Sequence, residues 1–295
     1  MPFPYIHETQ KITPSFRKER GGSFIALSNG YTHYELFGDE NAETVVLVHG
    51  FTVPNFIWEP TFNILTKAGY RVLRYDLFGR GYSDRPKADY TLNFFANQLH
   101  DLLNSLNITK PINLFGLSMG GPITATFTVL YPESVKKLAL FAPVGVDALH
   151  SSVLKLLKLP LVGELLMGLF GAKKLVDGIG KDFYDPKLIA NFTEKYKTQL
   201  KISGFGRAIL STIRNDALSE NRAIYERVTK TNIPLLLIWG EQDKTVPYVQ
   251  SSQMQASLKR AHFFPIPNSG HIPHYENAAE VNSIILNFLQ NINEL

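Results

Sequence analysis

Residues 113–121 read Asn113-Leu114-Phe115-Gly116-Leu117-Ser118-Met119-Gly120-Gly121, and this stretch decides the fold class. An apolar run leads to a serine, and a helix-forming segment follows it. Glycines two positions before and after Ser118 allow a tight turn, because a side chain there would collide with the crowded backbone. The turn holds the serine in a strained conformation, which lifts its hydroxyl clear of the strand and beside free amides at the helix start. The stretch therefore predicts a nucleophilic serine at a strand-to-helix turn.

Composition sets broad limits on what the chain can be. Its 295 residues, of which 44% are hydrophobic, suffice for one large α/β domain or two small ones. It has no cysteine, which excludes disulfides, thiolate catalysis and cysteine-ligated metals. The net charge of +4 is a mild excess, and the basic cluster at 17–20 fits a solvated arm. Nothing in this charge pattern indicates a nucleic-acid partner.

The chain carries no obvious membrane or export signal. The first residues lack a basic segment followed by an apolar run, so no secretory signal is expected. The most apolar stretch, 159–170, is shorter than a membrane span and contains Gly163 and Glu164. We therefore expect a cytoplasmic protein without a transmembrane segment.

Strands and helices alternate along most of the chain. Asn29-Gly30 joins two short strands, 23–27 and 31–36, as a hairpin. Six further strands are expected at 45–48, 70–75, 112–117, 135–141, 234–239 and 262–266. Helices are expected between them at 58–68, 92–106, 119–130 and 249–258, with a last one at 278–289. This alternation predicts an α/β fold, with helices on both faces of a mostly parallel eight-stranded sheet.

The alternation stops between residues 144 and 232, where amphipathic helical segments are broken by prolines and glycines. We therefore predict an irregular N-terminal arm at 1–22, a sheet domain formed by 23–143 and 233–295, and an inserted helical cap at 144–232. Ligands of open parallel sheets bind beyond the carboxyl ends of the strands. The cap and the loops at those ends are expected to enclose the site.

A serine hydroxyl becomes a strong nucleophile when a base takes its proton, and the base needs a partner that fixes its tautomer. Asp243 follows the strand at 234–239, and His271 follows the strand at 262–266. Both are therefore candidates for the acid and the base. Asp147 is an alternative acid and His274 an alternative base.

Three motifs together resemble the α/β-hydrolase family: the G-x-S-x-G turn around Ser118, the Gly240-x-x-Asp243 step and the Gly270-His271 step. The resemblance implies that Ser118, Asp243 and His271 form a catalytic triad in the family's chain order. The oxyanion formed at an ester carbonyl needs preplaced donors. We expect these to be the backbone amides of Met119 and of Phe51, in His49-Gly50-Phe51-Thr52.

Two other motifs are interpreted as structural. Residues 76–83 resemble the family's D-x-x-G-x-G-x-S loop, in which Asp76 and Arg80 tie turns together. His49 is expected to hold hydrogen bonds rather than to catalyse. The glycine spacing does not fit a phosphate-binding loop, and no histidine pair has metal-ligand spacing. We expect neither a metal nor a cofactor.

The cap carries the information on the substrate. Leucines are denser at 153–170 than one amphipathic face requires, which indicates either ordinary packing or an apolar funnel for acyl chains. Lysines 155, 158, 173 and 174 on its rim suggest weak contact with a lipid surface. The expected substrate-pocket residues are Phe51, Met119, Val144, Leu154, Leu157, Leu161, Val246 and Ile272.

The resemblance covers the chain from about Phe24 onward and favours an esterase or lipase, similar to monoacylglycerol lipases, acting on a small ester with an apolar acyl chain. Ser118 argues against relatives with an aspartate nucleophile. A carbon–carbon bond hydrolase of ring-cleavage products is the alternative, although Leu117 and Ile272 differ from the residues usual there. A ligand-binding homologue without turnover is a third possibility, and the oligomeric state stays open.

Overall fold

The computed structural model describes residues 5–147 and 152–290. The eight predicted strands form one sheet in the order β1-β2-β4-β3-β5-β6-β7-β8, which confirms the predicted fold class. β1 and β2 are antiparallel to their neighbours, and the remaining strands are parallel. The strands are β1 Ser23–Leu27, β2 Gly30–Phe37, β3 Thr44–Val48, β4 Arg71–Tyr75, β5 Ile112–Leu117, β6 Val135–Phe141, β7 Leu235–Gly240 and β8 Ala261–Ile266.

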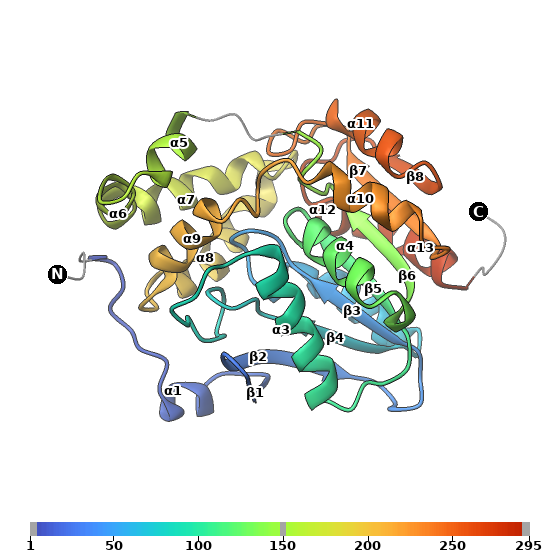
Figure 1. Ribbon diagram of the computed structural model, residues 1–295, viewed down its shortest axis with the longest axis horizontal. Helices are drawn as coiled ribbons and strands as arrows, with labels where there is room; N and C mark the ends of the chain where they lie inside the picture. The colour runs from blue at the N-terminus through green and yellow to red at the C-terminus, as the bar shows by residue number, and fades with distance from the viewer. Residues whose placement is uncertain (1–4, 148–151, 291–295) are drawn as a thin grey trace.

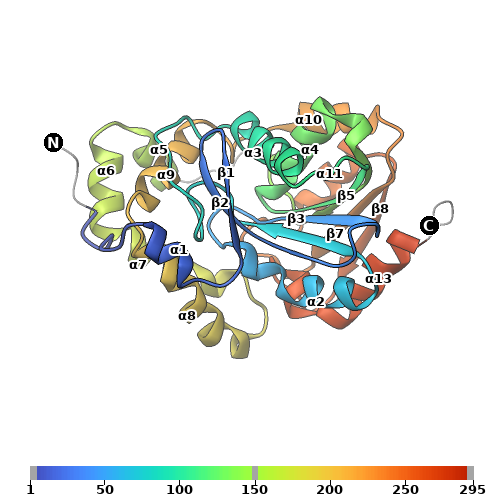
Figure 2. The same ribbon diagram turned by 90° about the horizontal axis from the view of Figure 1, so that it is seen from below.

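Helices cover both faces of the sheet, as Figure 2 shows from below. One face carries α3 (Leu92–Ser105), α4 (Gly120–Leu130), α10 (Arg222–Thr229) and α11 (Gln250–Ser257). The other carries α2 (Glu59–Lys67) and α13 (Ala278–Gln290), and three short helices lie at loops, η1 (Asn55–Trp58), η2 (Pro132–Ser134) and α12 (Pro273–Glu276).

The central strands are apolar throughout because both of their faces are covered. Every residue of β3 and β5 is buried. Along β3, Val46 and Val48 belong to the core on one side of the sheet, and Val45 and Leu47 to the core on the other. This is the period of two that a strand imposes on its side chains.

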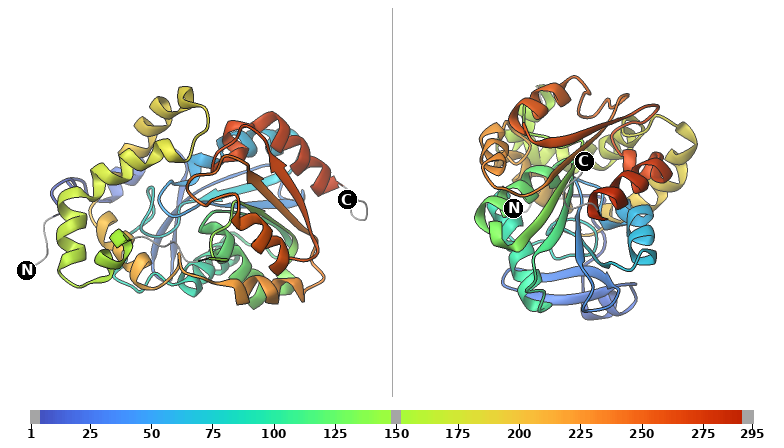
Figure 3. Two further views of the ribbon diagram at one scale, coloured as in Figure 1. Left: turned by 90° about the horizontal axis from the view of Figure 1, so that it is seen from above. Right: turned by 90° about the vertical axis from the view of Figure 1, so that its right-hand side faces the viewer.

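The inserted helices gather at one end of the sheet domain, on the left of Figure 1 and of the left view in Figure 3. They are α5 (Ser152–Lys158), α6 (Val162–Leu166), a π-helical turn η3 (Met167–Gly171), α7 (Ala172–Gly178), η4 (Ile179–Lys181), η5 (Pro186–Leu188), α8 (Ile189–Leu200) and α9 (Phe205–Arg214). They follow β6 and precede β7, so they lie beyond the carboxyl ends of the parallel strands.

The cap ends earlier than the predicted boundary at residue 232. Helix α10 contacts α4 and α11 on the sheet domain (Figure 1). Its Tyr225 is fully buried in the same core as α4, and the Tyr225 hydroxyl donates a 2.5 Å hydrogen bond to the Val144 carbonyl. The sequence pattern does not predict this boundary, because the apolar face of an amphipathic helix does not indicate whether the helix packs on the sheet domain or within the cap.

The N-terminal arm is more ordered than predicted. It contains a short helix, α1 (Pro14–Lys18), whose Arg17 forms a 2.8 Å ion pair with Asp84. Upstream, the Glu8 carboxylate accepts hydrogen bonds from the amides of Gly204 and Gly206 at the start of α9. The arm therefore joins the cap to the sheet domain. Within the part of the chain that the structure describes, no helix is long and apolar enough to cross a membrane.

Candidate active site

The turn after β5 has the geometry that its sequence predicts. Ser118 has a φ of 55°, a strained value for a residue with a side chain. A methyl group on Gly116 would lie 2.4 Å from the Gly120 carbonyl oxygen, and one on Gly120 would lie 2.4 Å from the Val48 carbonyl oxygen. Both positions therefore exclude any side chain. The β5–α4 turn packs against the end of β3, and only 7% of Ser118 is exposed.

Asp243 and His271 meet at the ends of β7 and β8. His271 Nδ1 lies 2.8 Å from Asp243 Oδ2. The other oxygen of Asp243 accepts 2.8 Å hydrogen bonds from the amides of Thr245 and Val246, which fix the carboxylate in place. When Nδ1 donates a hydrogen bond to the Asp243 carboxylate, Nε2 is left free to act as a base.

The pKa of His271 is raised above its usual value by its neighbours. Burial lowers the pKa, but the charge of Asp243 and its hydrogen bond outweigh burial, and the charge of Asp182 adds to them. The protonated imidazole that a general base becomes is thus stabilised in this site.

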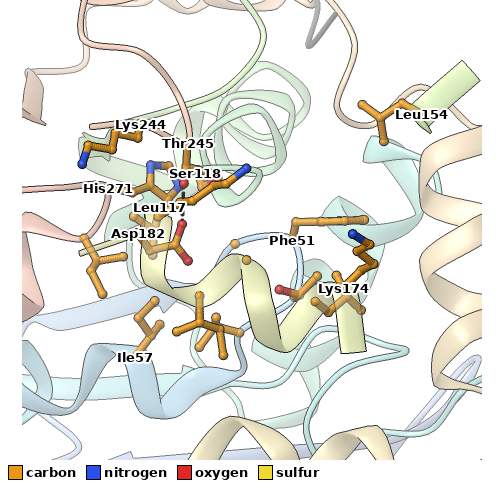
Figure 4. Close-up of a pocket in the computed structure, with 18 residues that line it drawn as sticks. Phe51, Ile57, Leu117, Ser118, Leu154, Lys174, Asp182, Lys244, Thr245 and His271 are labelled. Carbon is orange, nitrogen blue, oxygen red and sulfur yellow. Dashed lines mark hydrogen bonds between the residues drawn. The ribbon is translucent and has the colours of Figure 1, made fainter. Parts of the chain in front are cut away.

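Ser118 and His271 line one cavity of about 440 Å³ between the sheet domain and the cap. Figure 4 shows both side chains on its wall. Within the described residues, no hydrogen bond joins the Ser118 hydroxyl to His271. Catalytic hydrogen bonds are often long without substrate and shorten when it binds.

The predicted oxyanion donors lie beside the nucleophile. A methyl group on Gly50 would be 3.1 Å from Ser118 Cβ, so the loop that contains Phe51 contacts the serine directly. The Phe51 carbonyl accepts a 2.8 Å hydrogen bond from Nε of the buried Arg80. Among the described residues, neither the Phe51 amide nor the Met119 amide has a hydrogen-bond acceptor. Both donors are therefore available to a substrate oxygen.

The alternative acid and base lie elsewhere. The His274 ring is fully buried, packs 4.2 Å from the ring of Trp58, and does not line the cavity. Burial lowers the pKa of His274 to about 3. Asp147 also lies outside the cavity lining, and the carboxylate that contacts His271 Nδ1 belongs to Asp243.

The motifs interpreted as structural make structural contacts. His49 Nε2 accepts a hydrogen bond from the Leu77 amide, and His49 Nδ1 lies 2.8 Å from the Gly50 carbonyl oxygen. Burial lowers the pKa of His49 to about 4, so the ring is neutral. Asp76 accepts hydrogen bonds from the amides of Asn55 and Tyr82. Residues 5–147 and 152–290 contain no group of three or more His, Asp or Glu side chains placed to hold a metal ion.

The eight expected pocket residues separate into two groups. Three of them, Phe51, Leu154 and Ile272, line the cavity. The other five lie outside its lining: Met119, Val144, Leu157, Leu161 and Val246. Four of these five, all but Leu161, are buried in the hydrophobic cores. Leu161 differs, since it is 73% exposed on the outer surface of the cap.

Several residues of the cavity are not among those expected from the sequence. The cap contributes apolar Leu175 and Ile179 and the acid Asp182, and three lysines also line the cavity, Lys174, Lys181 and Lys244. Lys244 and Thr245 directly follow Asp243 in the sequence, so the Gly240-x-x-Asp243 motif could have indicated both. The cap residues belong to no motif, so no local signal could have found them.

A strained serine, a buried histidine–carboxylate pair and two amides at the strand ends are the kinds of group from which a hydrolytic site can be built. Comparison with known proteins identifies the family. The model of the alpha/beta hydrolase family matches residues 45–284, and the chain belongs to that family.

Individual relatives have different named activities. Lipase 3 of Moraxella sp. (strain TA144) is 28% identical over 286 residues, covering 92% of this chain and 86% of its own. A bacterial membrane phospholipase A superposes with a TM-score of 0.73 at 26% identity, covering 91% of this chain and 85% of its own. The meta-cleavage product hydrolase of Pseudomonas fluorescens IP01 superposes with a TM-score of 0.76 at 21% identity, covering 92% of this chain and 98% of its own. The protein is thus an α/β hydrolase, and family membership alone does not select its substrate.

Proposed function

We propose that this protein is a serine hydrolase that cleaves carboxylic esters with apolar acyl chains, in the manner of an esterase or lipase. The observation that carries the proposal is the His271–Asp243 pair, 2.8 Å apart, on the wall of the cavity that Ser118 also lines. Lipase 3 and the membrane phospholipase A, two similar proteins, are named for ester cleavage.

The proposed reaction uses these groups in two halves. Ser118 Oγ bonds to the acyl carbon while its proton passes to His271 Nε2, and the carbonyl oxygen becomes an oxyanion held by the Phe51 and Met119 amides. His271 then gives that proton to the leaving alcohol as the ester bond breaks. Water, deprotonated by His271, attacks the acyl-enzyme, and the proton returns to Ser118 as the acid leaves. Asp243 keeps His271 in the required tautomer throughout.

The cavity wall supports an apolar acyl chain. The cap side offers Leu154, Leu175 and Ile179, and the sheet-domain side offers Val53 and Ile57. Such a wall binds alkyl chains by removing them from water, at about 0.8 kcal/mol for each buried CH₂.

Two experiments test the reaction. A fluorophosphonate probe should label the wild-type protein and leave Ser118→Ala unlabelled; labelling of that variant, or no labelling of the wild type, contradicts the proposal.

A chain-length series of p-nitrophenyl esters should show kcat/KM rising from acetate to medium-chain esters. A ring-cleavage product assayed in parallel covers carbon–carbon bond hydrolysis, which the fold similarity to the meta-cleavage product hydrolase keeps as the second candidate. Faster turnover of that product than of every ester would favour the second candidate.

The outer face of the cap supports weak contact with an anionic lipid surface. Many apolar side chains are exposed there: Val153, Leu156, Leu159, Leu161, Val162, Leu165, Leu169 and Phe170. Exposed lysines of α5 and α7 lie in or beside the same segment: Lys155, Lys158, Lys173 and Lys174. Lys158 pairs with Asp216 and Lys173 with Asp177, and Lys174 also lines the cavity. Apolar side chains with lysines beside them suit an interface with anionic lipids.

Vesicle sedimentation tests this contact without relying on activity. We expect the Ser118→Ala protein to bind vesicles that contain phosphatidylglycerol and to bind less when Leu169→Asp is added. The matched control is Leu130→Asp, because Leu130 is similarly exposed, at 46%, on the sheet domain. Equal binding by both aspartate variants would contradict docking through the cap.

A further inference from the structure

The acid Asp182 lies in the catalytic centre although it belongs to the cap. It follows η4 directly, and its side chain lines the same cavity as Ser118 and His271. Figure 4 shows its carboxylate beside the His271 ring. The proposed reaction gives this residue no role.

Asp182 contacts both catalytic loops. Its backbone carbonyl accepts a 2.8 Å hydrogen bond from the His271 amide. Its Oδ1 accepts a 2.6 Å hydrogen bond from the Thr245 hydroxyl, and the Thr245 amide donates to Asp243 Oδ1 at 2.8 Å. Thr245 therefore bridges the carboxylates of Asp182 and Asp243, and the imidazole of His271 is near both.

Close packing holds this part of the cap in place. A methyl group on Gly270 would lie 2.4 Å from the Asp182 carbonyl oxygen, so the two loops touch through their backbones. The Glu276 carboxylate accepts hydrogen bonds from the amides of Gly270, Tyr184 and Asp185, which join the same cap segment to the histidine loop a second time. Asp182 thus has a fixed position relative to His271.

We propose that Asp182 is a positioning residue of the hydrolase, whose backbone holds the His271 loop and whose carboxylate stabilises the protonated His271 that forms when Ser118 attacks. Asp182 takes no proton from the substrate or from Ser118; it acts through its charge. The inference rests on the proposed triad, because it assigns His271 the role of base.

The charges around the imidazole agree with this role. Burial raises the pKa of Asp182 above its usual value, and the charge of Asp243 raises it further, while the charge of His271 and the Thr245 hydrogen bond lower it. Protonation of His271 and ionisation of Asp182 therefore favour each other. The other titratable groups near the pair include His274, which interacts electrostatically with His271, and Tyr196, whose pKa is raised by burial and by the charge of Asp182. The cavity lysines Lys174, Lys181 and Lys244 line the same wall.

The test is Asp182→Asn, which removes the charge and keeps the backbone carbonyl and an acceptor for Thr245. We expect the acid limb of the kcat/KM profile to move to lower pH by about one unit, because an opposite charge nearby shifts a pKa by about that much or more. We expect kcat on the plateau to fall about tenfold, with little change in KM. A purely structural role predicts no movement of the acid limb.

Three further variants calibrate the effect. Thr245→Val removes the hydroxyl whose hydrogen bond favours the ionised form of Asp182. It should move the acid limb of the kcat/KM profile to lower pH, by less than Asp182→Asn does. Thr245→Ser keeps the hydroxyl and should have the wild-type profile. Asp177→Asn makes the same charge change on an exposed side chain of the cap that pairs with Lys173, and it should leave the profile unchanged.

A measurement without turnover separates this inference from the proposed function. NMR titration should give His271 a lower pKa in Ser118→Ala/Asp182→Asn than in Ser118→Ala. An unchanged His271 pKa, or an acid limb that stays in place or moves to higher pH in Asp182→Asn, would overturn the role of Asp182. Full ester hydrolysis by Ser118→Ala would instead overturn the triad, whatever the titration shows.

Discussion

Gly50 packs directly on Ser118: a methyl group on Gly50 would stand 3.1 Å from Ser118 Cβ and 3.6 Å from its Oγ. The loop after β3 and the turn after β5 are therefore in contact, and the Phe51 amide is held beside the nucleophile. We expect Gly50→Ala to push this loop away by a few tenths of an ångström. Such a displacement should lower kcat by about tenfold to a hundredfold with a small change in KM. Steady-state kinetics on a p-nitrophenyl ester measure this, and an unchanged kcat would show that the loop supplies no oxyanion donor.

Removing the Ser118 hydroxyl should abolish the chemistry and preserve the fold. We expect Ser118→Ala to lower kcat on the order of 10⁶-fold, as loss of the nucleophile does in other serine hydrolases. Circular dichroism should give the wild-type spectrum, because the side chain is small and only its hydroxyl is lost. Retention of more than a hundredth of the activity would point to another nucleophile.

Asp243 should be the acid that orients His271. Asp243→Asn is expected to lower kcat about 10⁴-fold, because the amide favours the wrong histidine tautomer. Asp147→Asn is the comparison, since Asp147 follows β6 but does not line the cavity. We expect it to keep nearly full activity. A large loss in Asp147→Asn with a mild one in Asp243→Asn would reverse the assignment.

Activity should depend on the protonation of His271. The base works in its neutral form, so kcat/KM falls as pH drops through the pKa of His271. Since the charges of Asp243 and Asp182 raise that pKa, the midpoint of the acid limb is expected above about 6.5, the usual value for histidine. A pH–rate profile on a substrate without ionisable groups measures the midpoint. A rate that stays constant down to pH 4 would contradict His271 as the base.

Gly120 should contribute to the stability of the fold. Alanine normally stabilises a helix relative to glycine, but a methyl group on Gly120 would lie 2.4 Å from the Val48 carbonyl oxygen and 2.8 Å from that of His49. Neither oxygen can move without shifting the end of β3. We expect Gly120→Ala to lower the free energy of unfolding by about 1–3 kcal/mol.

Urea denaturation measures the effect of Gly120→Ala. The matched control is Gly21→Ala, because a methyl group on Gly21 would have no atom within 4 Å and the φ of Gly21 is not in the left-handed region. We expect it to change the free energy of unfolding by less than about 0.5 kcal/mol. Equal stability of the two variants would show that β3 and α4 can move apart to accommodate the methyl group without lowering the free energy of unfolding.

The fold was predictable because its signals are local. Apolar runs such as 45–48 and 112–117 differ from the amphipathic helices between them, and the glycines around Ser118 allow only a tight turn. The covered faces follow from right-handed crossovers, whereas the order of the strands came from the tertiary structure. The cap boundary was not predictable, because the amphipathic pattern of α10 does not say that Tyr225 packs beside α4 rather than within the cap.

The pocket was less predictable than the motifs. Met119 and Val144 stand next to catalytic segments in the sequence, yet their side chains are buried in the core behind the site. A residue beside a motif has its backbone near the site, but the direction of its side chain depends on how the surrounding core packs. The residues that line the cavity are therefore decided by tertiary packing.

The sequence by itself determined the α/β-hydrolase fold, the serine turn and the identity of an aspartate and a histidine suited to serve it, because each of these depends on the residues of one short segment. Only the tertiary structure decided that Asp243 is the carboxylate that meets His271, which side chains enclose the cavity, and that Asp182 reaches the catalytic centre from the cap. These contacts join segments far apart in the chain, and a distance between such segments is fixed by how the sheet, the loops and the cap pack together.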